Sequence, residues 1–205
     1  MRDDYSYLDP DYQYTDPKTG VLRNLHNISD HTMLNIVESG ASTKRANELL
    51  EHPIKIKSTE SLLKIHFCLF QDVYEWAGKL RTVEISKKGR QFFPSSKFNN
   101  GFSYIDTLVS DYRATENGDT QGLTYLLAVI LDSVNYLHPF REGNGRTQRE
   151  FIRLLALEKG YFINLNPPDN PDIFERYMTG TIDSDIPKLQ ALLLELMEKE
   201  VNHVN

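Results

Sequence analysis

Apolar residues recur at helical spacing over much of the chain. The first such stretch has apolar side chains at steps of three and four: Leu62, Ile65, Leu69, Val73 and Trp76. This spacing is typical of a helix that buries one face. We expect Ser58 to cap the start of this helix and Gly78 to end it, because serine accepts hydrogen bonds from unpaired amides and glycine tolerates the left-handed conformation that closes a helix.

Four further stretches have the same periodicity. An apolar stripe runs over residues 102–112, residues 123–137 are apolar almost all round, and a helix expected over about 146–159 is followed by Gly160. A last helix, from about residue 184, has one apolar face made of Leu189, Leu192, Leu193, Leu196 and Met197. A segment that is apolar on all sides belongs inside a core, so residues 123–137 are expected to form the central helix.

A strand-like pattern occurs between residues 82 and 93. Two short β-prone runs, Thr82–Ile85 and Gln91–Phe93, flank the sequence SKKGR and predict a β-hairpin. Residues 1–25 are rich in tyrosine and contain a turn at DPKTG, which predicts an extended arm that packs on the core. The expected fold is therefore all-α with one small β-hairpin, organised as an arm over residues 1–25 and a domain over residues 26–205.

Composition and charge narrow the classes of function. The 205 residues include 29 acidic and 23 basic side chains, and the net charge of −6 argues against direct binding of nucleic acid. The single cysteine, Cys68, excludes an intrachain disulfide and suits a reducing cytoplasm. The most apolar stretch, residues 123–137, is shorter than the roughly 20 residues of a membrane-spanning helix. We expect a cytoplasmic protein that binds neither nucleic acid nor membrane.

The candidate chemistry lies in the sequence HPFREGNGRTQRE, which begins at His138. Gly143 and Gly145 permit the positive φ of a tight turn, and a turn that leads into a helix points several backbone amides at one spot. Arg146 and Arg149 are three positions apart on the helix and share a face, so both can reach one anion. These features predict a site for a polyphosphate.

The remaining polar residues of this stretch complete a reaction site. Glu142 beside an anion predicts a bridging cation, and Mg²⁺ favours carboxylate and phosphate oxygens. Asn144 can donate a hydrogen bond to phosphate, and Phe140 is expected to anchor the turn in the core. His138 is the best general base, because its unperturbed pKa lies near 6.5. Together they predict attack of a hydroxyl on phosphorus with loss of pyrophosphate; the alternative is a basic connecting turn whose histidine caps a helix.

The stretch resembles the Fic-domain signature H-x-F-x-[D/E]-G-N-G-R-x-x-R at every position. A second block, residues 65–92, is similar to the helix and hairpin flap of that family, and YTDPKTGVLRN resembles the start of bacterial Fic toxins. The resemblance implies a mostly helical Fic fold and protein adenylylation with Mg-ATP. It implies one catalytic base, one metal ligand and several nucleotide contacts: His138; Glu142; and Gly143, Asn144, Gly145, Arg146 and Arg149.

The resemblance also implies partners. The flap strand would pair with an extended segment of the target, and Lys87 and Lys88 at its tip are candidate contacts to nucleotide or target, with a solvated turn as the alternative. Many Fic proteins carry an inhibitory helix with the motif [S/T]-x-x-x-E-[G/N], which this sequence lacks. We therefore expect a toxin inhibited by a separate small antitoxin that docks at Arg149. Type II topoisomerase subunits are the implied targets.

Other activities remain open at this point. A second Fic reaction would transfer UMP, phosphocholine or a whole phosphate. Phosphate-transferring relatives carry lysine where this chain has Gly145, so the intact Gly-Asn-Gly favours nucleotidyl transfer. A different class of function is an inactive nucleotide-binding module.

Overall fold

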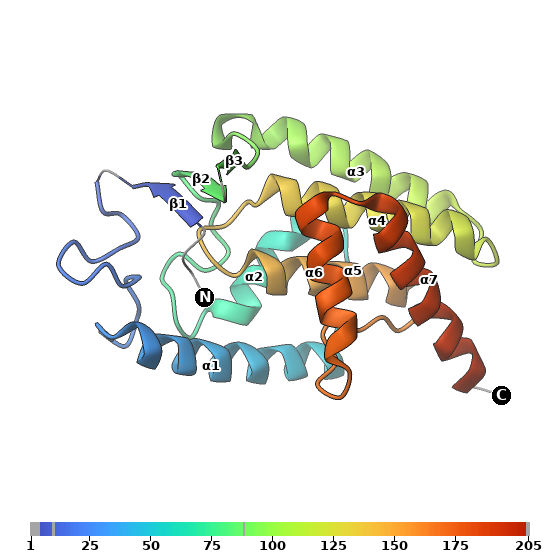
Figure 1. Cartoon of the computed structure of the whole chain (residues 1–205), viewed down its shortest axis with the longest axis horizontal. Helices are drawn as coiled ribbons and strands as arrows, with labels where there is room; N and C mark the ends of the chain where they lie inside the picture. The colour runs from blue at the N-terminus through green and yellow to red at the C-terminus, as the bar shows by residue number, and fades with distance from the viewer. Residues whose placement is uncertain (1–4, 10, 88, 204–205) are drawn as a thin grey trace. The chain divides into compact units, whose positions relative to one another are not determined.

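The computed structural model describes residues 5–9, 11–87 and 89–203, and its elements are labelled in Figure 1. Helices dominate, and the expected mostly helical fold with a small β-sheet is confirmed. In chain order the elements are β1 (Tyr5–Leu8), α1 (His31–Glu51), α2 (Ser61–Phe70), β2 (Glu84–Lys87), β3 (Arg90–Gln91), the 3-10 turn η1 (Ser95–Lys97), α3 (Phe98–Ala114), α4 (Thr120–Leu137), α5 (Asn144–Glu158), α6 (Pro171–Asp183) and α7 (Ile186–His203). None of the helices within these described ranges has the length and hydropathy needed to cross a membrane.

The chain forms two compact units. The first contains the described parts of Met1–Lys55, Glu60–Phe98 and Leu137–Thr147, and the second contains the described parts of Ile56–Thr59, Asn99–Tyr136 and Gln148–Asn205. Each unit is built from segments that are far apart in the sequence. The loop between α4 and α5 and the first turn of α5 belong to the first unit.

The first unit buries the predicted stripe Leu62, Ile65, Leu69 and Val73, and α1 packs against α2. Helix α2 ends at Phe70, however, and turns carry the chain to Gly78, which has φ +74°. The prediction of one helix up to Gly78 is therefore wrong in extent. Ser58 is not its cap, since the N-cap position is Glu60.

Helix α1 has a face that is only partly apolar. Its buried residues are Leu34, Glu38, Ser42 and Leu49, so half of that face is polar and hydrophobic periodicity alone does not single the helix out. Asp30 caps its start by accepting a hydrogen bond from the amide of Met33, at 2.8 Å. The buried carboxylate of Glu38 needs a partner, and Arg146 in the first turn of α5 and the hydroxyl of Tyr74 supply it.

The predicted hairpin is present as β2 and β3, and a third strand joins it. β1 pairs with β2 in antiparallel register, with Ser6 opposite Ser86, so β2 is the central strand of the sheet. The arm before α1 is thus partly a strand rather than only an extended segment. Tyr14, Val21 and Leu22 in this arm are buried.

The second unit buries the apolar faces expected of its helices. All five residues of the α7 stripe from Leu189 to Met197 are buried, and α7 packs against α6. Helix α4 buries Leu127, Ala128 and Leu131 but leaves about half of Tyr125 exposed, so it is not buried on all sides. Helix α7 begins at Ile186, two residues after the predicted start.

Candidate active site

The candidate site is built on the loop between α4 and α5. α4 ends at Leu137, because Pro139 disfavours a helical conformation of the residue before it, and α5 begins at Asn144. Gly143 has φ +81°, and a Cβ at this position would overlap the ring of Phe70. Both facts explain why glycine is required here, since a side chain would be strained and would clash.

Asn144 closes this loop with its side-chain amide. Its Oδ1 accepts the Phe140 amide at 2.9 Å and its Nδ2 donates to the Phe140 carbonyl at 2.7 Å. Gly145 is already helical, so the expectation that it supplies a positive φ is wrong; of the two glycines, only Gly143 does so. The Thr147 hydroxyl donates to the Gly143 carbonyl at 3.0 Å. The first amides of α5 therefore follow directly after the glycine turn, an arrangement that binds anions.

Phe140 anchors the loop, as expected, and it is 1% exposed. Its ring stacks on His66 with 3.9 Å between centroids and an interplanar angle of 16°. The Gly78 amide donates to His66 Nδ1 at 2.8 Å, so Nε2 carries the proton and donates to the Glu142 carbonyl at 3.0 Å. Burial lowers the pKa of His66 to about 3. His66 is therefore a neutral clamp that holds the loop to α2.

Arg146 is held by the polar face of α1. Its guanidinium donates to the carboxylate of Glu38 and, at 3.0 Å, to the hydroxyl of Ser42. Glu38 also accepts the hydroxyl of Tyr74, and the guanidinium lies 4.6 Å over the ring of Phe70. Because Glu38 is 3% exposed, this carboxylate fixes the direction of the Arg146 side chain.

Arg149 has different surroundings, in the second unit. Its guanidinium lies 5.3 Å over the ring of Phe174 and 5.5 Å over the ring of Tyr177. Among the residues that the structure describes, no carboxylate forms an ion pair with Arg149. The two arginines are three positions apart on α5, yet their side chains have separate partners. Gln148 between them donates to the hydroxyl of Tyr177.

Glu142 lies at the turn and is half-buried. Its Oε1 accepts the amide of Gly143 at 3.0 Å. In the described parts of the chain, no group of three or more His, Cys, Asp or Glu side chains is gathered for a metal. A metal here would take one carboxylate from the protein and its other ligands from phosphate and water, which is the coordination that Mg²⁺ favours. Glu142 therefore fits Mg²⁺ bound together with a nucleotide.

His138 has an unusual backbone conformation. Its φ of +45° lies in the left-handed region, which costs a non-glycine residue about 1–3 kcal/mol and persists only when surrounding contacts hold it. Its ring stacks on Phe92, just after β3, with 3.8 Å between centroids. Its carbonyl accepts a hydrogen bond from Arg81 at 2.8 Å. The hairpin and the predicted base are thus in direct contact.

Of the two flap lysines, the structure describes Lys87. Lys87 is the last residue of β2 and lies opposite Arg90, and Lys88 lies outside the described residues.

Sequence reasoning missed the residues that hold this site in place. Glu38 and Ser42 lie more than a hundred positions before Arg146, and Arg81 is 57 positions before His138. No spacing rule connects such pairs. The sequence offered no signal for these pairs, because the burial of Glu38 is visible only in the folded chain.

Most of the chain is similar to proteins of one family. The Fic/DOC family profile matches residues 56–156. Protein adenylyltransferase VbhT of Bartonella schoenbuchensis is 41% identical over 152 residues, which cover 74% of this chain and 32% of that protein. The chain thus spans about a third of that relative's length. "Probable protein adenylyltransferase y4lH" of Sinorhizobium fredii is 34% identical over 181 residues, covering 85% and 90% of the two chains.

Solved structures share the fold. The structure of BepC from Bartonella tribocorum, described as having bound AMPPNP, has a TM-score of 0.77 and 19% identity, and the match covers 90% of this chain and 96% of that one.

Proposed function

Because this chain belongs to the Fic/DOC family, we propose that it transfers AMP from ATP to a hydroxyl side chain of another protein and releases pyrophosphate. The membership confirms the resemblance found in the motif. The observation that carries the proposal is the glycine turn at Gly143, which leads into the N-terminus of α5 with His138 at the start of the same loop. Amides at a helix N-terminus bind phosphate, and a histidine at the same loop can accept a proton.

The proposed step uses the residues as follows. The target hydroxyl loses its proton to His138, its oxygen bonds to the α-phosphorus, and the bond from that phosphorus to the bridging oxygen breaks. The amides of Gly143–Gly145, the second N–H of the Asn144 amide, and the two arginines would hold the phosphates. Mg²⁺ held by Glu142 would neutralise phosphate charge. Positioning and electrostatic stabilisation account for most catalysis of this kind.

Labelled nucleotides test this reaction. Transfer of label from α-labelled ATP, without transfer from γ-labelled ATP, is the expected result. Label from the γ-phosphate would indicate whole-phosphate transfer, and preference for α-labelled UTP would indicate transfer of UMP. No transfer from any nucleotide, with ATP still bound in calorimetry, would favour an inactive nucleotide-binding module.

The sheet indicates which edge of the flap would receive the target. β2 is central and its far side pairs with β1, so the target would lie along β3. The Phe92 amide donates to the Ile85 carbonyl at 3.1 Å. Because hydrogen-bonded and non-hydrogen-bonded pairs alternate in an antiparallel ladder, the Gln91–Ser86 pair is of the second kind and the amide of Gln91 points away from β2. Gln91 is exposed.

Gln91→Pro therefore removes one outward amide and leaves the hairpin bonds intact. Proline is tolerated at such edge positions. One hydrogen bond contributes about 0.5–1.5 kcal/mol net, so kcat/KM for the target should fall several-fold while ATP affinity stays unchanged. Gln91→Ala is the matched control, since it removes the side chain and keeps the amide. Equal kcat/KM for the two variants would contradict docking along β3.

We also propose that the protein is the toxin of a toxin–antitoxin pair in the cytoplasm. A small antitoxin would supply a glutamate that pairs with Arg149. Within the described chain, Arg149 contacts two aromatic rings and forms no ion pair with a carboxylate. Type II topoisomerase subunits are the proposed targets, and Lys87 and Lys88 the proposed flap contacts. Co-expression with the small neighbouring reading frame should abolish adenylylation, and Arg149→Lys should weaken that inhibition. Unchanged adenylylation in the presence of the partner would refute the pairing.

A further inference from the structure

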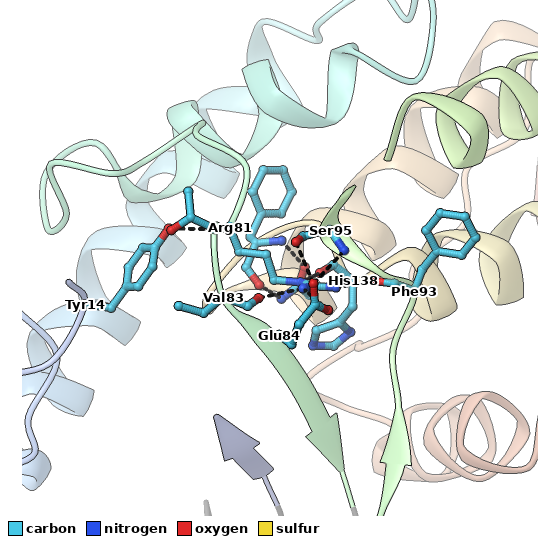
Figure 2. Close-up of polar contacts among 10 residues, drawn as sticks. Tyr14, Arg81, Val83, Glu84, Phe93, Ser95 and His138 are labelled. Atoms are coloured by element: carbon cyan, nitrogen blue, oxygen red, sulfur yellow. Dashed lines mark hydrogen bonds and ion pairs between the residues drawn. The ribbon is translucent and has the colours of Figure 1, made fainter. Parts of the chain in front are cut away.

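Arg81 is a buried arginine whose guanidinium joins four acceptors. Its Nε–H donates to the carbonyl of His138 at 2.8 Å, and Nη1 donates to the carbonyl of Val83 at 2.6 Å. Nη2 donates to the carbonyl of Phe93 at 2.5 Å, and Nη1 also reaches the carboxylate of Glu84 at 3.3 Å. The Arg81 side chain is fully buried. Figure 2 shows the guanidinium in the middle of these groups.

The acceptors belong to two parts of the first unit. Val83 lies just before β2 and Phe93 lies two residues after β3, so Arg81 ties together the two ends of the hairpin. The remaining carbonyl belongs to His138, and the Arg81 amide donates to the next carbonyl, that of Pro139, at 2.8 Å. One residue thus fixes the hairpin and the start of the candidate loop relative to each other.

Glu84 and Phe98 keep the guanidinium in place. Glu84 also accepts from the amide and the hydroxyl of Ser95, at 3.0 and 2.6 Å, which fixes the carboxylate (Figure 2). The ring of Phe98 lies 4.9 Å from the guanidinium carbon. Burial lowers the pKa of Arg81, while Glu84 opposes this. An arginine nevertheless stays charged at any physiological pH, so the network is permanent.

We propose that Arg81 is the positioning residue that sets His138 relative to the flap, an inference that rests on the proposed transfer reaction. The left-handed backbone of His138 needs outside contacts to persist, and the Arg81 bond to its carbonyl is such a contact. Phe92, whose ring stacks on His138, precedes the Phe93 carbonyl that Arg81 also holds. A target strand docked on the flap therefore presents its hydroxyl to a base in fixed register.

Lysine cannot replace this arginine. A guanidinium presents five N–H groups in a planar fork, whereas an ammonium is a compact point charge. Arg81→Lys keeps the charge but cannot serve both ends of the hairpin and His138 together. The matched control is Arg113→Lys in the second unit, which also has a forked guanidinium that bonds Glu158 and the carbonyl of Ile56.

The test separates positioning from folding. In Arg81→Lys, kcat for AMP transfer should fall on the order of 10–10²-fold, since displacements near 1 Å cost about that much. The KM for ATP should stay within twofold, because Arg81 bonds none of the proposed phosphate contacts, and the His138 ring resonances should shift as the Phe92 stack changes. Arg113→Lys should keep both kcat and the His138 resonances.

The outcomes distinguish the two claims. A wild-type protein that transfers no AMP refutes the proposed function, and the His138 resonances then still report on Arg81. An active wild type with unchanged kcat and unchanged His138 resonances in Arg81→Lys overturns the inference. If circular dichroism shows that Arg81→Lys does not fold, Glu84→Gln removes one charged acceptor at a half-exposed position. That variant should lower kcat a few-fold and shift His138 in the same direction, and no change in either would overturn the inference.

Discussion

Two buried histidines of the first unit stack on phenylalanines in nearly the same way, yet their surroundings assign them different roles. His66 lies on Phe140 and His138 lies on Phe92, with centroid distances of 3.9 and 3.8 Å and the same interplanar angle of 16°. The Gly78 amide and a loop carbonyl occupy both ring nitrogens of His66. His138 is held differently, because Arg81 donates a hydrogen bond to its backbone carbonyl.

The comparison teaches what separates a structural histidine from a candidate base. Stacking and burial are shared, so neither is diagnostic. His66 is completely buried and its pKa is lowered to about 3, first by burial and further by the charge of Arg146, against an opposing hydrogen bond to the carbonyl of Glu142. A ring that stays neutral and is bonded at both nitrogens holds two segments together. His138 lies at the contact of the flap with the loop, where a substrate hydroxyl is proposed to arrive.

The largest expected effect is the loss of activity when His138 is replaced. His138→Ala should lower AMP transfer by on the order of 10²–10⁴-fold, the usual cost of losing a general base. ATP affinity in calorimetry should remain, since the proposed phosphate contacts are elsewhere in the loop and α5. His31→Ala, at an exposed position of α1, is the control and should be silent. Wild-type transfer by His138→Ala would remove this histidine from the mechanism.

The two phenylalanines should separate by stability. Phe140→Ala should cost about 3–5 kcal/mol of unfolding free energy, because it empties a closed core position. Phe92 is half-buried, and Phe92→Ala should cost roughly 0.5–1.5 kcal/mol for the lost stack while kcat falls a few-fold. Urea unfolding measures both. Equal destabilisation by the two substitutions would show that the flap is as much a part of the core as the loop.

The last expected effect is on the pH dependence of stability. Between pH 6.5 and about 3 the unfolded chain protonates His66 and the folded chain does not, so this residue makes stability fall as pH decreases, by up to about 1.4 kcal/mol per pH unit.

Glutamine at this position offers a hydrogen-bond donor and an acceptor without titrating. His66→Gln should cost about 1–3 kcal/mol at pH 7.5, and its difference from wild type should shrink as pH falls below 6.5. A difference that is constant with pH would indicate that the pKa of His66 is the same in the folded and the unfolded chain.

Much of the fold could be predicted from local patterns in the sequence. The apolar stripe on α7, the end of α4 before Pro139 and the burial of Phe140 follow from side-chain type and neighbouring positions. So does the positive φ of Gly143. The extent of α2 could not be predicted from the spacing. The helical spacing of apolar residues continues past Phe70 into the turns that lead to Gly78, and apolar residues in these turns are also buried. Helix α1 was not predicted, because Glu38 and Ser42 stand in place of apolar residues on its buried side.

By itself, the sequence determined the mostly helical class of fold and predicted the chemistry of the loop that starts at His138, because both depend on residue type and on spacings of a few positions. Only the tertiary structure decided how that loop is held: Glu38 on Arg146, Arg81 on His138, and β1 along the flap strand. Each of these contacts joins residues that are dozens of positions apart, and buried charges and open strand edges take whichever partner the folded chain brings within hydrogen-bond distance.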